Sequence, residues 1–312
     1  MRPDASRWFA RRTLRAAAAP SVRDLVALAG GRTASVVVPA LDEEPTVGGV
    51  VSAVLPLVGA GLVDEVLVVD GGSADGTVRA ARSAGARVID VADLLPAHGA
   101  RPGKGESMWK SLDATDGDLV VYLDADVVGA SADWVAGLLW PLLSDPDVSF
   151  VKACYDRPLG DDPTAGGRVT ELTVRPLLDL LHPALAGFVQ PLAGECAATR
   201  SLLESLPFGG GYAVEIGLLL DAYDTVGLDG MAQVDLGVRR HRNRSTTELG
   251  RMSAAVVAET LGRSGVGLRS GTLTQFGRTD GRYAPVDVPA SAEARPPMAT
   301  VPEYAARRAR AS

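Results

Sequence analysis

The chain has 312 residues, a hydrophobic content of 46% and a formal net charge of -7. This length and composition suffice for one large α/β domain, and the acidic balance excludes a general attraction to nucleic acid or to anionic lipid. No apolar run is long enough to indicate a membrane span, and the amino terminus holds no secretory core, so we expect a cytoplasmic protein without membrane insertion.

The first part of the chain alternates strand and helix patterns. Residues 1–32 are expected to form a helix or a loose arm. Strands are predicted at 35–39, 65–70, 88–89 and 120–126, with a helical pattern before each of the last three. This succession predicts an α/β fold with a mostly parallel, doubly wound sheet, in which ligands bind at the carboxyl ends of the strands.

The predicted strand 120–126 ends in two carboxylates, Asp124 and Asp126. Side chains at positions i and i+2 share a face of a strand, so both acids are expected to leave the sheet together. Two hard oxygen donors suit Mg²⁺ or Mn²⁺, and such an ion suits a substrate that carries phosphate. Because isolated acid pairs also occur in ordinary turns, this prediction depends on the rest of the chain.

The second part of the chain is predicted to extend the same domain. Helices are expected at 131–143, 168–181, 201–205, 213–223 and 247–262. Strands are expected at 148–154 and 231–236. Cys154 and Cys196 are predicted to be reduced thiols in buried strands. The tail from Gly265 is rich in glycine, proline and serine, and we expect it to be poorly ordered.

Three basic or glycine-rich segments are candidate anion sites. Residues 239–244 carry the highest density of positive charge, and His241 within them is either a metal ligand or an ordinary surface histidine. The segment 166–170 combines backbone amides at a helix entrance with Arg168, although it could be a capping turn without a ligand. Lys104 stands between two glycines and could reach a phosphate, but the spacing is not that of a P-loop.

Three further acids are candidates for binding hydroxyl groups or a base. Glu43 follows the first predicted strand, Asp70 ends the second, and Glu215 lies in the first turn of a predicted helix. Asp70 could equally cap a turn, and Glu215 could equally stabilise the helix dipole.

Several of these segments together resemble a known family. Val-Val-Val-Pro-Ala-Leu-Asp-Glu-Glu, the strand that ends in Asp70, and Leu-Asp-Ala-Asp are similar to nucleotide-sugar glycosyltransferases of the GT-A fold. Arg-Pro-Gly-Lys-Gly-Glu, Gly-Gly-Arg-Val-Thr-Glu-Leu and His-Arg-Asn-Arg narrow the resemblance to actinobacterial glucosyl-3-phosphoglycerate synthases, over about residues 33–276. The resemblance implies a nucleotide-sugar-binding half at 33–155, an acceptor-binding half at 156–264 and a loop or tail at 265–312.

The resemblance implies a metal-dependent transfer of glucose from UDP-glucose to 3-phosphoglycerate with retained configuration, in a homodimer, as a step towards glucosylglycerate and methylglucose lipopolysaccharide. The donor would be held by Pro39, Ala40, Leu41, Glu43, Asp70, Lys104 and Asp124. The Mg²⁺ or Mn²⁺ ion would be held by Asp126 and His241. The acceptor and sugar would be held by Gly167, Arg168, Thr170, Tyr212, Glu215 and Asn243. The residues implied in catalysis are Asp124, Asp126, Glu215 and Arg239.

Gly71 departs from the family pattern, because a serine is expected there, and a hydroxyl contact to the nucleotide would be lost. No carboxylate can be placed behind the anomeric carbon as a nucleophile. We therefore expect front-face attack, with an oxygen of the leaving phosphate accepting the proton of the acceptor hydroxyl.

Other functions fit parts of the same sequence. The nearest is transfer from GDP-mannose to give mannosyl-3-phosphoglycerate, because the donor base is contacted mostly by backbone. A polyprenyl-phosphate sugar transferase is disfavoured by the lack of a membrane segment or basic amphipathic face, and a nucleotidylyltransferase by the absence of a basic glycine-rich loop near Pro39. A non-catalytic nucleotide-sugar-binding protein is disfavoured by the intact set of Asp124, Asp126, Lys104, Arg168 and His241.

Overall fold

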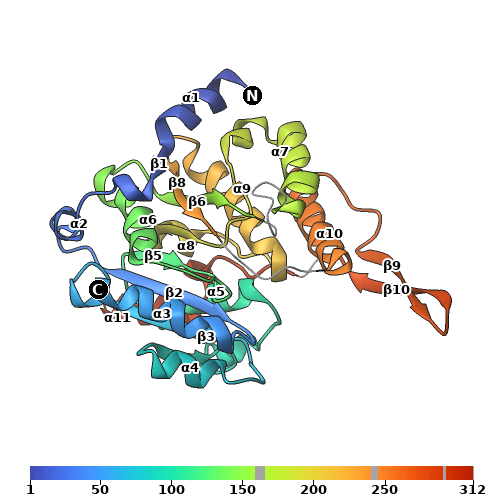
Figure 1. Cartoon of the computed structure of the whole chain (residues 1–312), viewed down its shortest axis with the longest axis horizontal. Helices are drawn as coiled ribbons and strands as arrows, with labels where there is room; N and C mark the ends of the chain where they lie inside the picture. The colour runs from blue at the N-terminus through green and yellow to red at the C-terminus, as the bar shows by residue number, and fades with distance from the viewer. Residues whose placement is uncertain (159–165, 240–244, 291–292, 312) are drawn as a thin grey trace.

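A computed structural model describes residues 1–158, 166–239, 245–290 and 293–311. Within these residues, an eight-stranded sheet with the order β1-β8-β6-β7-β5-β2-β3-β4 runs through the body of the molecule (Figure 1). Neighbouring strands are parallel except where β7 pairs with β5 and β6. The predicted α/β fold with a mostly parallel sheet is confirmed.

The bounds of the elements follow the alternation of the sequence closely. The strands of the large sheet are β1 (Thr13–Arg15), β2 (Ala34–Ala40), β3 (Glu65–Asp70), β4 (Arg87–Asp90), β5 (Leu119–Tyr122), β6 (Phe150–Asp156), β7 (Cys196–Thr199) and β8 (Met231–Val238). The α-helices are α1 (Pro3–Arg12), α2 (Val22–Ala29), α3 (Glu44–Gly59), α4 (Thr77–Ser83), α5 (Lys104–Ala114), α6 (Ala132–Ser144), α7 (Arg175–Leu181), α8 (Arg200–Ser205), α9 (Val214–Val226), α10 (Thr246–Arg263) and α11 (Pro302–Ala311).

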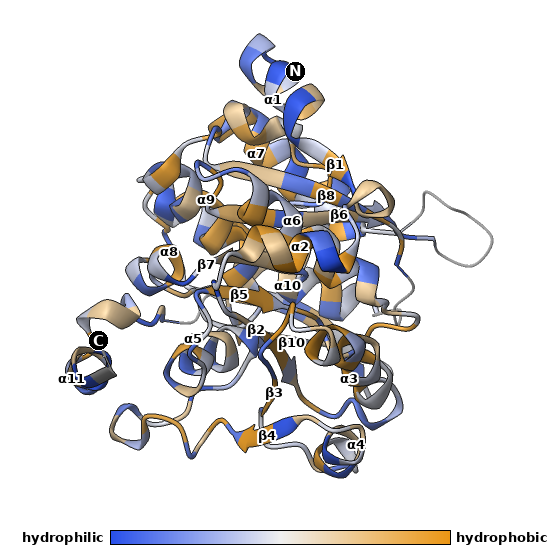
Figure 2. Ribbon diagram, turned by 90° about the vertical axis from the view of Figure 1, so that its left-hand side faces the viewer, coloured by the Kyte–Doolittle hydropathy of each residue, from blue (hydrophilic) through white to orange (hydrophobic). Residues whose placement is uncertain are grey.

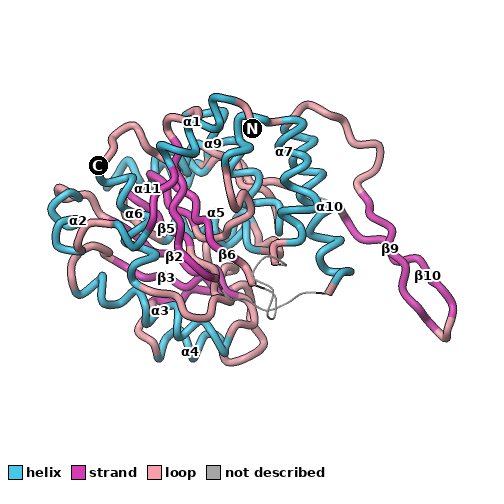
Figure 3. Tube along the Cα trace, turned by 45° about the horizontal axis from the view of Figure 1, so that its top comes forward, coloured by secondary structure: helices cyan, strands magenta, loops and turns pink. Residues whose placement is uncertain are grey.

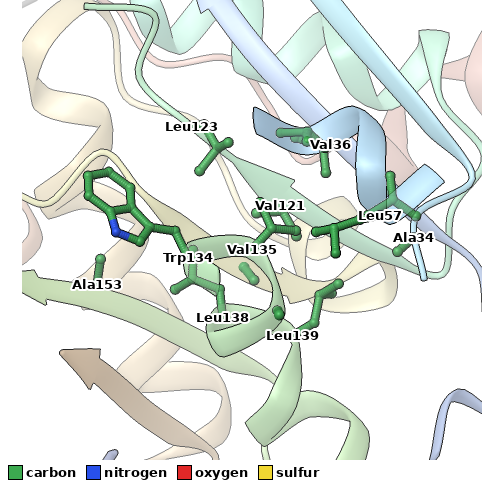
Figure 4. Close-up of a cluster of buried hydrophobic side chains, with 14 of the residues drawn as sticks. Ala34, Val36, Leu57, Val121, Leu123, Trp134, Val135, Leu138, Leu139 and Ala153 are labelled. Atoms are coloured by element: carbon green, nitrogen blue, oxygen red, sulfur yellow. The ribbon is translucent and has the colours of Figure 1, made fainter. Parts of the chain in front are cut away.

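Helices cover both faces of the sheet, which explains why its inner strands are nearly continuous apolar runs (Figures 2 and 3). Along β2, Val36 and Val38 belong to the core under α2, α3 and α6, whereas Val37 belongs to the core under α5 and α9. Figure 4 shows Val121 in the first of these cores, together with Leu138 of α6. The carboxyl ends of the parallel strands are thereby fixed at one edge of a rigid sheet.

The central strand is shorter than the sequence predicts. β5 ends at Tyr122, so Asp124 and Asp126 lie beyond it and not within the strand. The reason is the antiparallel neighbour β7, which begins at Cys196 opposite Tyr122 and offers no partner further along. Leu123 still donates its N–H to the carbonyl of Val37 at 3.0 Å, and the chain then turns away from the sheet.

The amino-terminal residues pack on the body of the protein. Trp8 of α1 is buried, contacts the ring of Phe188 with a centroid distance of 4.3 Å, and donates its indole N–H to the carbonyl of Met231 at 3.0 Å. The following strand β1 then adds a parallel edge to β8. This segment therefore extends the sheet that carries the site.

The expectation of a poorly ordered tail from Gly265 is wrong. Strands β9 (Thr272–Thr279) and β10 (Arg282–Pro289) form an antiparallel hairpin that projects from the body beside α10 (Figures 1 and 3). Asp280 and Gly281 have positive φ angles of 50° and 74° between the strands, as the tight turns of β-hairpins require. Beyond the hairpin, Met298 and Tyr304 are buried in the core. The prediction failed because it used only the composition of the tail and did not consider the Asp-Gly turn or the apolar residues that pack into the core.

Two smaller expectations concern the cysteines and the membrane. Cys154 and Cys196 are free thiols in buried strands, as predicted, and burial raises the pKa of Cys154 to about 12 and that of Cys196 to about 11. Among the described helices, none combines the length and the apolar character needed to cross a bilayer.

Candidate active site

A cavity of about 710 Å³ lies at the carboxyl ends of β2 and β5. It is lined by most of the site residues that the sequence predicts, namely Pro39, Ala40, Leu41, Glu43, Lys104, Asp124, Asp126, Gly167, Arg168, Thr170, Tyr212, Glu215 and Arg239. His241 and Asn243 lie outside the described residues. The fold thus brings segments from both parts of the chain to one cavity, while the role of each residue stays a prediction.

Asp70 is the exception among the described candidates. Its carboxylate accepts hydrogen bonds from the N–H of Gly72 at 3.1 Å, the N–H of Ser73 at 3.0 Å and the hydroxyl of Ser73 at 2.6 Å. Both oxygens are therefore engaged in the turn after β3, which is the capping role that the sequence left open. Gly71, and not Asp70, lies on the cavity wall.

Six charged side chains form a network, here called the cavity cluster: Lys104, Asp124, Asp126, Glu195, Glu215 and Arg239. All except the fully buried Glu195 line the cavity. Arg239 donates from Nη2 to Asp124 at 2.6 Å and to Asp126 at 2.9 Å. Lys104 donates to Asp124 and, at 2.8 Å, to Glu215. The two acids of the predicted metal pair do converge, but they do so on a buried arginine beyond the end of the strand.

Arg239 differs from what its charged segment indicates. The sequence allows a solvated arginine, yet the side chain is only 2% exposed. Its Nε donates to Glu195 at 2.7 Å, and Glu195 also accepts the hydroxyl of Tyr155 at 2.8 Å. Sequence reasoning missed Glu195. The available signal was an acid at the start of a buried strand, because a buried carboxylate requires a partner of opposite charge.

The position of Lys104 follows from the glycine that precedes it. Gly103 has a φ of 108°, and a Cβ there would lie 2.7 Å from the Cα of Gly211. Only glycine allows this approach, and α5 begins directly afterwards at Lys104. Lys104 is thereby held on the first turn of α5, facing Glu215 in the first turn of α9.

The environment fixes the charges of Lys104 and Asp124 at neutral pH. Burial by itself lowers the pKa of Lys104, but Asp124 and Glu215 outweigh this and hold it well above its usual value. Burial raises the pKa of Asp124, but Lys104 and Arg239 outweigh it and hold the pKa well below its usual range. These two groups therefore act as fixed charges and not as a proton donor and acceptor.

The donor set fits a divalent cation. Within the cavity cluster, four carboxylates face two basic groups, which leaves two negative charges without a counter-charge in the cluster. Across the described residues, no three acids, histidines or cysteines are grouped as a full metal cage. A hard cation bound through one or two carboxylates completes its shell with water and substrate phosphates, so the open arrangement fits a metal shared with a diphosphate.

The turn at Gly167 forms another wall of the cavity. Gly167 has a φ of 69°, and the helical segment that begins with Arg168 and Val169 continues into the π-helical turn η3 (Thr170–Val174). The irregular turn η3 directly precedes α7, so the single helix predicted at 168–181 is divided into two segments. The hydroxyl of Thr170 is buried and has no hydrogen-bond partner in the described part of the chain. An anionic ligand that accepts from this hydroxyl would satisfy it.

Comparisons with known proteins agree with this geometry. Residues 35–179 match the family model "Glycosyl transferase family 2". The glucosyl-3-phosphoglycerate synthase of Mycolicibacterium smegmatis is 50% identical over 285 residues, which cover 90% of this chain and 94% of the relative. The crystal structure of the synthase from Mycobacterium tuberculosis with Mn²⁺, UDP-glucose and phosphoglyceric acid aligns with a TM-score of 0.85 at 47% identity, over 92% of this chain and 97% of the other. A structure of that enzyme with Mg²⁺ and UDP aligns with the same TM-score, identity of 47%, and coverage of 92% and 98%.

Proposed function

Because this chain belongs to the glucosyl-3-phosphoglycerate synthase family, we propose that it transfers glucose from UDP-glucose to 3-phosphoglycerate and releases UDP. The observation that carries the proposal is the single cavity of about 710 Å³ that joins the strand-end carboxylates to the glycine-rich turn at Gly167. The first feature suits a metal-bound diphosphate and the second suits an anionic acceptor.

On the donor side, the ends of β2 and β5 would hold UDP-glucose. The segment Pro39–Leu41 and Glu43 would contact the uridine, and Asp124 would contact the ribose or the glucose. Asp126, together with His241, would hold Mg²⁺ or Mn²⁺, which supplies Lewis-acid stabilisation of the diphosphate leaving group. The net negative charge of the cavity cluster supports this assignment.

On the acceptor side, Gly167, Arg168 and Thr170 would bind the phosphate of 3-phosphoglycerate, with Asn243 beside it. The unpartnered hydroxyl of Thr170 and the backbone amides of the turn support this assignment. Tyr212, which lines the cavity, would face the sugar and the acceptor.

The chain's own charged groups then favour transfer with retained configuration. Glu215 is held by Lys104 at 2.8 Å, so its charge is engaged and it would orient the sugar and acceptor without forming a bond to the sugar. Arg239 would keep Asp124 and Asp126 aligned and add positive charge beside the departing UDP. The acceptor oxygen bonds to the anomeric carbon as the bond to the phosphate oxygen breaks, and that phosphate oxygen takes the hydroxyl proton. A covalent glucosyl adduct trapped on Glu215 would refute this route.

We also propose that the protein is a cytoplasmic homodimer. Leu172 and Leu180 are 77% and 80% exposed, and Phe276 and Tyr283 on the hairpin are each 70% exposed, which is apolar surface that a second copy could cover. The two phosphorylated substrates and the two unpaired cysteines suit the cytoplasm. Light scattering of the purified protein should give twice the mass of the chain, and a monomer would contradict the dimer.

The test of the function is nucleotide release from UDP-glucose and GDP-mannose, each with and without 3-phosphoglycerate and Mg²⁺. The expected result is UDP release from UDP-glucose that requires both the metal and 3-phosphoglycerate, and its loss in an Asp126→Ala control. Release of GDP from GDP-mannose instead would show that the proposed donor is wrong and that the proposed acceptor is right. Binding of UDP-glucose without acceptor-dependent release would indicate a binding protein and overturn the proposal.

A further inference from the structure

Arg157 is a cavity residue to which the proposed reaction has so far given no task. It follows the carboxyl end of β6 directly and lines the cavity together with Asp124 and Arg168. Its Nε is shielded from water and has no hydrogen-bond partner among the residues that the structure describes. Burying an N–H donor without a hydrogen-bond partner costs folding free energy. A ligand that binds the guanidinium would offset this cost.

The backbone of Arg157 is packed against the glycine turn. A Cβ at Gly166 would collide with the carbonyl oxygen of Arg157, and a Cβ at Gly167 would lie 3.8 Å from its Cδ. The side chain therefore runs along the turn that carries Arg168. This places a second guanidinium next to the proposed acceptor-binding segment.

The guanidinium of Arg157 also lies near the cavity cluster. Its Cζ is 5.8 Å from the centre of the Tyr155 ring, and the Cζ of Arg239 is 5.6 Å from the centre of the same ring. Arg157, Asp124 and Asp126 all line the same cavity. Arg157 thus stands between the glycine turn and the carboxylates at the strand end.

The chemistry of 3-phosphoglycerate matches this placement. The molecule carries a phosphate on C3, a carboxylate at C1 and the reacting hydroxyl on C2. The carboxylate is attached directly to C2, which carries the reacting hydroxyl. The phosphorus is separated from C2 by C3 and the ester oxygen. If the phosphate occupies the turn at Gly167, the carboxylate must lie nearer to the transfer point, which is the direction in which Arg157 extends.

We propose that Arg157 binds the carboxylate of the acceptor and makes the enzyme select a phosphorylated 2-hydroxy acid over a phosphorylated alcohol. This inference rests on the proposed function, because it assigns a contact within the same reaction. A guanidinium and a carboxylate form paired, charge-assisted hydrogen bonds that a neutral alcohol cannot replace. Arg157 is therefore a specificity-determining residue, and Arg168 serves the phosphate that both acceptors share.

The experiment compares two acceptors, 3-phospho-D-glycerate and sn-glycerol 1-phosphate. The second has the same configuration at C2 and the same phosphate, but a hydroxymethyl group replaces the carboxylate. Acceptor-dependent UDP release is measured for the wild type, Arg157→Gln, Arg157→Lys and the matched control Arg168→Gln. We expect R157Q to raise the KM for 3-phosphoglycerate by about 10- to 100-fold, the loss typical of a hydrogen bond to a charged group. The ratio of kcat/KM between the two acceptors should fall by a similar factor, whereas R168Q should lower kcat/KM for both acceptors alike.

The remaining arms separate binding from folding. R157K keeps the charge and should retain part of the acceptor preference, and the affinity of R157Q for UDP-glucose, measured by calorimetry without acceptor, should stay within about twofold of the wild type. If R157Q lowers kcat/KM for both acceptors by the same factor, or leaves the ratio unchanged, the assignment is wrong. If the wild type itself shows no turnover with 3-phosphoglycerate, the proposed function fails first and the assignment fails with it.

Discussion

Helix α5 contributes to two ionic clusters, and they are built in opposite ways. At its amino terminus, Lys104 belongs to the cavity cluster, whose members Asp124 and Asp126 keep 21% and 25% of their side-chain surface exposed. Further along, Glu106 and Lys110 meet Arg295 from the carboxyl-terminal segment, in what we call the sealed cluster. The three residues of the sealed cluster are all buried.

The sealed cluster is satisfied by the protein itself. Glu106 accepts two hydrogen bonds from Arg295, each of 2.7 Å. The remaining donors bond to backbone carbonyls, as Arg295 donates to His98 at 3.0 Å and Lys110 donates to Val91 at 3.0 Å. Two cations share one carboxylate without any need of a ligand. The cavity cluster has the reverse balance, with four carboxylates and two basic groups, and three of these carboxylates line the cavity.

This difference indicates that the sealed cluster stabilises the fold, whereas the cavity cluster binds ligands. The sealed cluster attaches the residues around His98, which lead into the start of α5, to the carboxyl-terminal segment, and the Arg295 guanidinium also lies 5.0 Å from the ring of Trp109. It holds the helix on which Lys104 stands. The cavity cluster has two more carboxylates than basic groups, and the carboxylates that line the cavity are available for a cation and its bound phosphates.

The largest effect is expected from Asp126→Asn, which removes one of the excess charges and changes little else in shape. Acceptor-dependent UDP release should fall by about 10²–10³-fold, as is typical when one preorganised electrostatic group of an active site is lost. Stability should stay close to that of the wild type, because less like-charge repulsion offsets the weaker bond to Arg239. Steady-state kinetics and thermal unfolding measure the two. A variant that keeps its activity, or that loses stability in place of activity, would contradict the functional role of the excess charge.

The complementary change is Arg295→Met in the sealed cluster. It leaves Glu106 buried with Lys110 as its remaining cationic partner, and breaking a buried pair in this way costs about 3–5 kcal/mol of unfolding free energy. Urea denaturation should show this loss, while kcat per folded molecule should change by only a few-fold. The double variant Glu106→Gln with Arg295→Met should recover part of the stability. An unchanged stability with a large loss of kcat would instead make the sealed cluster part of the reaction.

The contrast between the clusters also shows what the sequence can predict. Between residues 35 and 262, local patterns located most of the strands and helices. The fold brings the acids, glycines and lysine of the recognisable motifs to one cavity, as expected, with the exception of Asp70. These features depend on residues close together in the chain. The functional roles assigned to them, including those of His241 and Asn243, stay predictions.

The pairings that close each cluster could not be predicted in the same way. Glu106 and Arg295 are separated by 189 positions, and Arg239 and Glu195 by 44, so no local pattern connects them. Glu195 and Arg157 belong to no short motif with a known spacing, and their importance follows from which buried charges meet in space. The turn at Asp280 was visible in the sequence as an Asp-Gly pair, but the composition of the tail outweighed it.

The smallest effect distinguishes the two clusters by the alkaline titration of their lysines. Burial lowers the pKa of Lys110, although Glu106 opposes it, whereas Asp124 and Glu215 raise that of Lys104 despite its burial. Unfolded lysine titrates near pH 10.4. A lowered native pKa means that the unfolded chain binds more protons below this pH. The wild type should therefore gain stability relative to Lys110→Met as the pH rises towards about 10.4. A raised native pKa has the opposite sign, so the stability of the wild type relative to Lys104→Met should be constant up to about pH 10 and fall above it. Urea denaturation at each pH measures the difference in unfolding free energy between the wild type and each variant. If this difference changes with pH in the same direction for both variants, the two clusters do not shift the pKa values of their lysines in opposite directions.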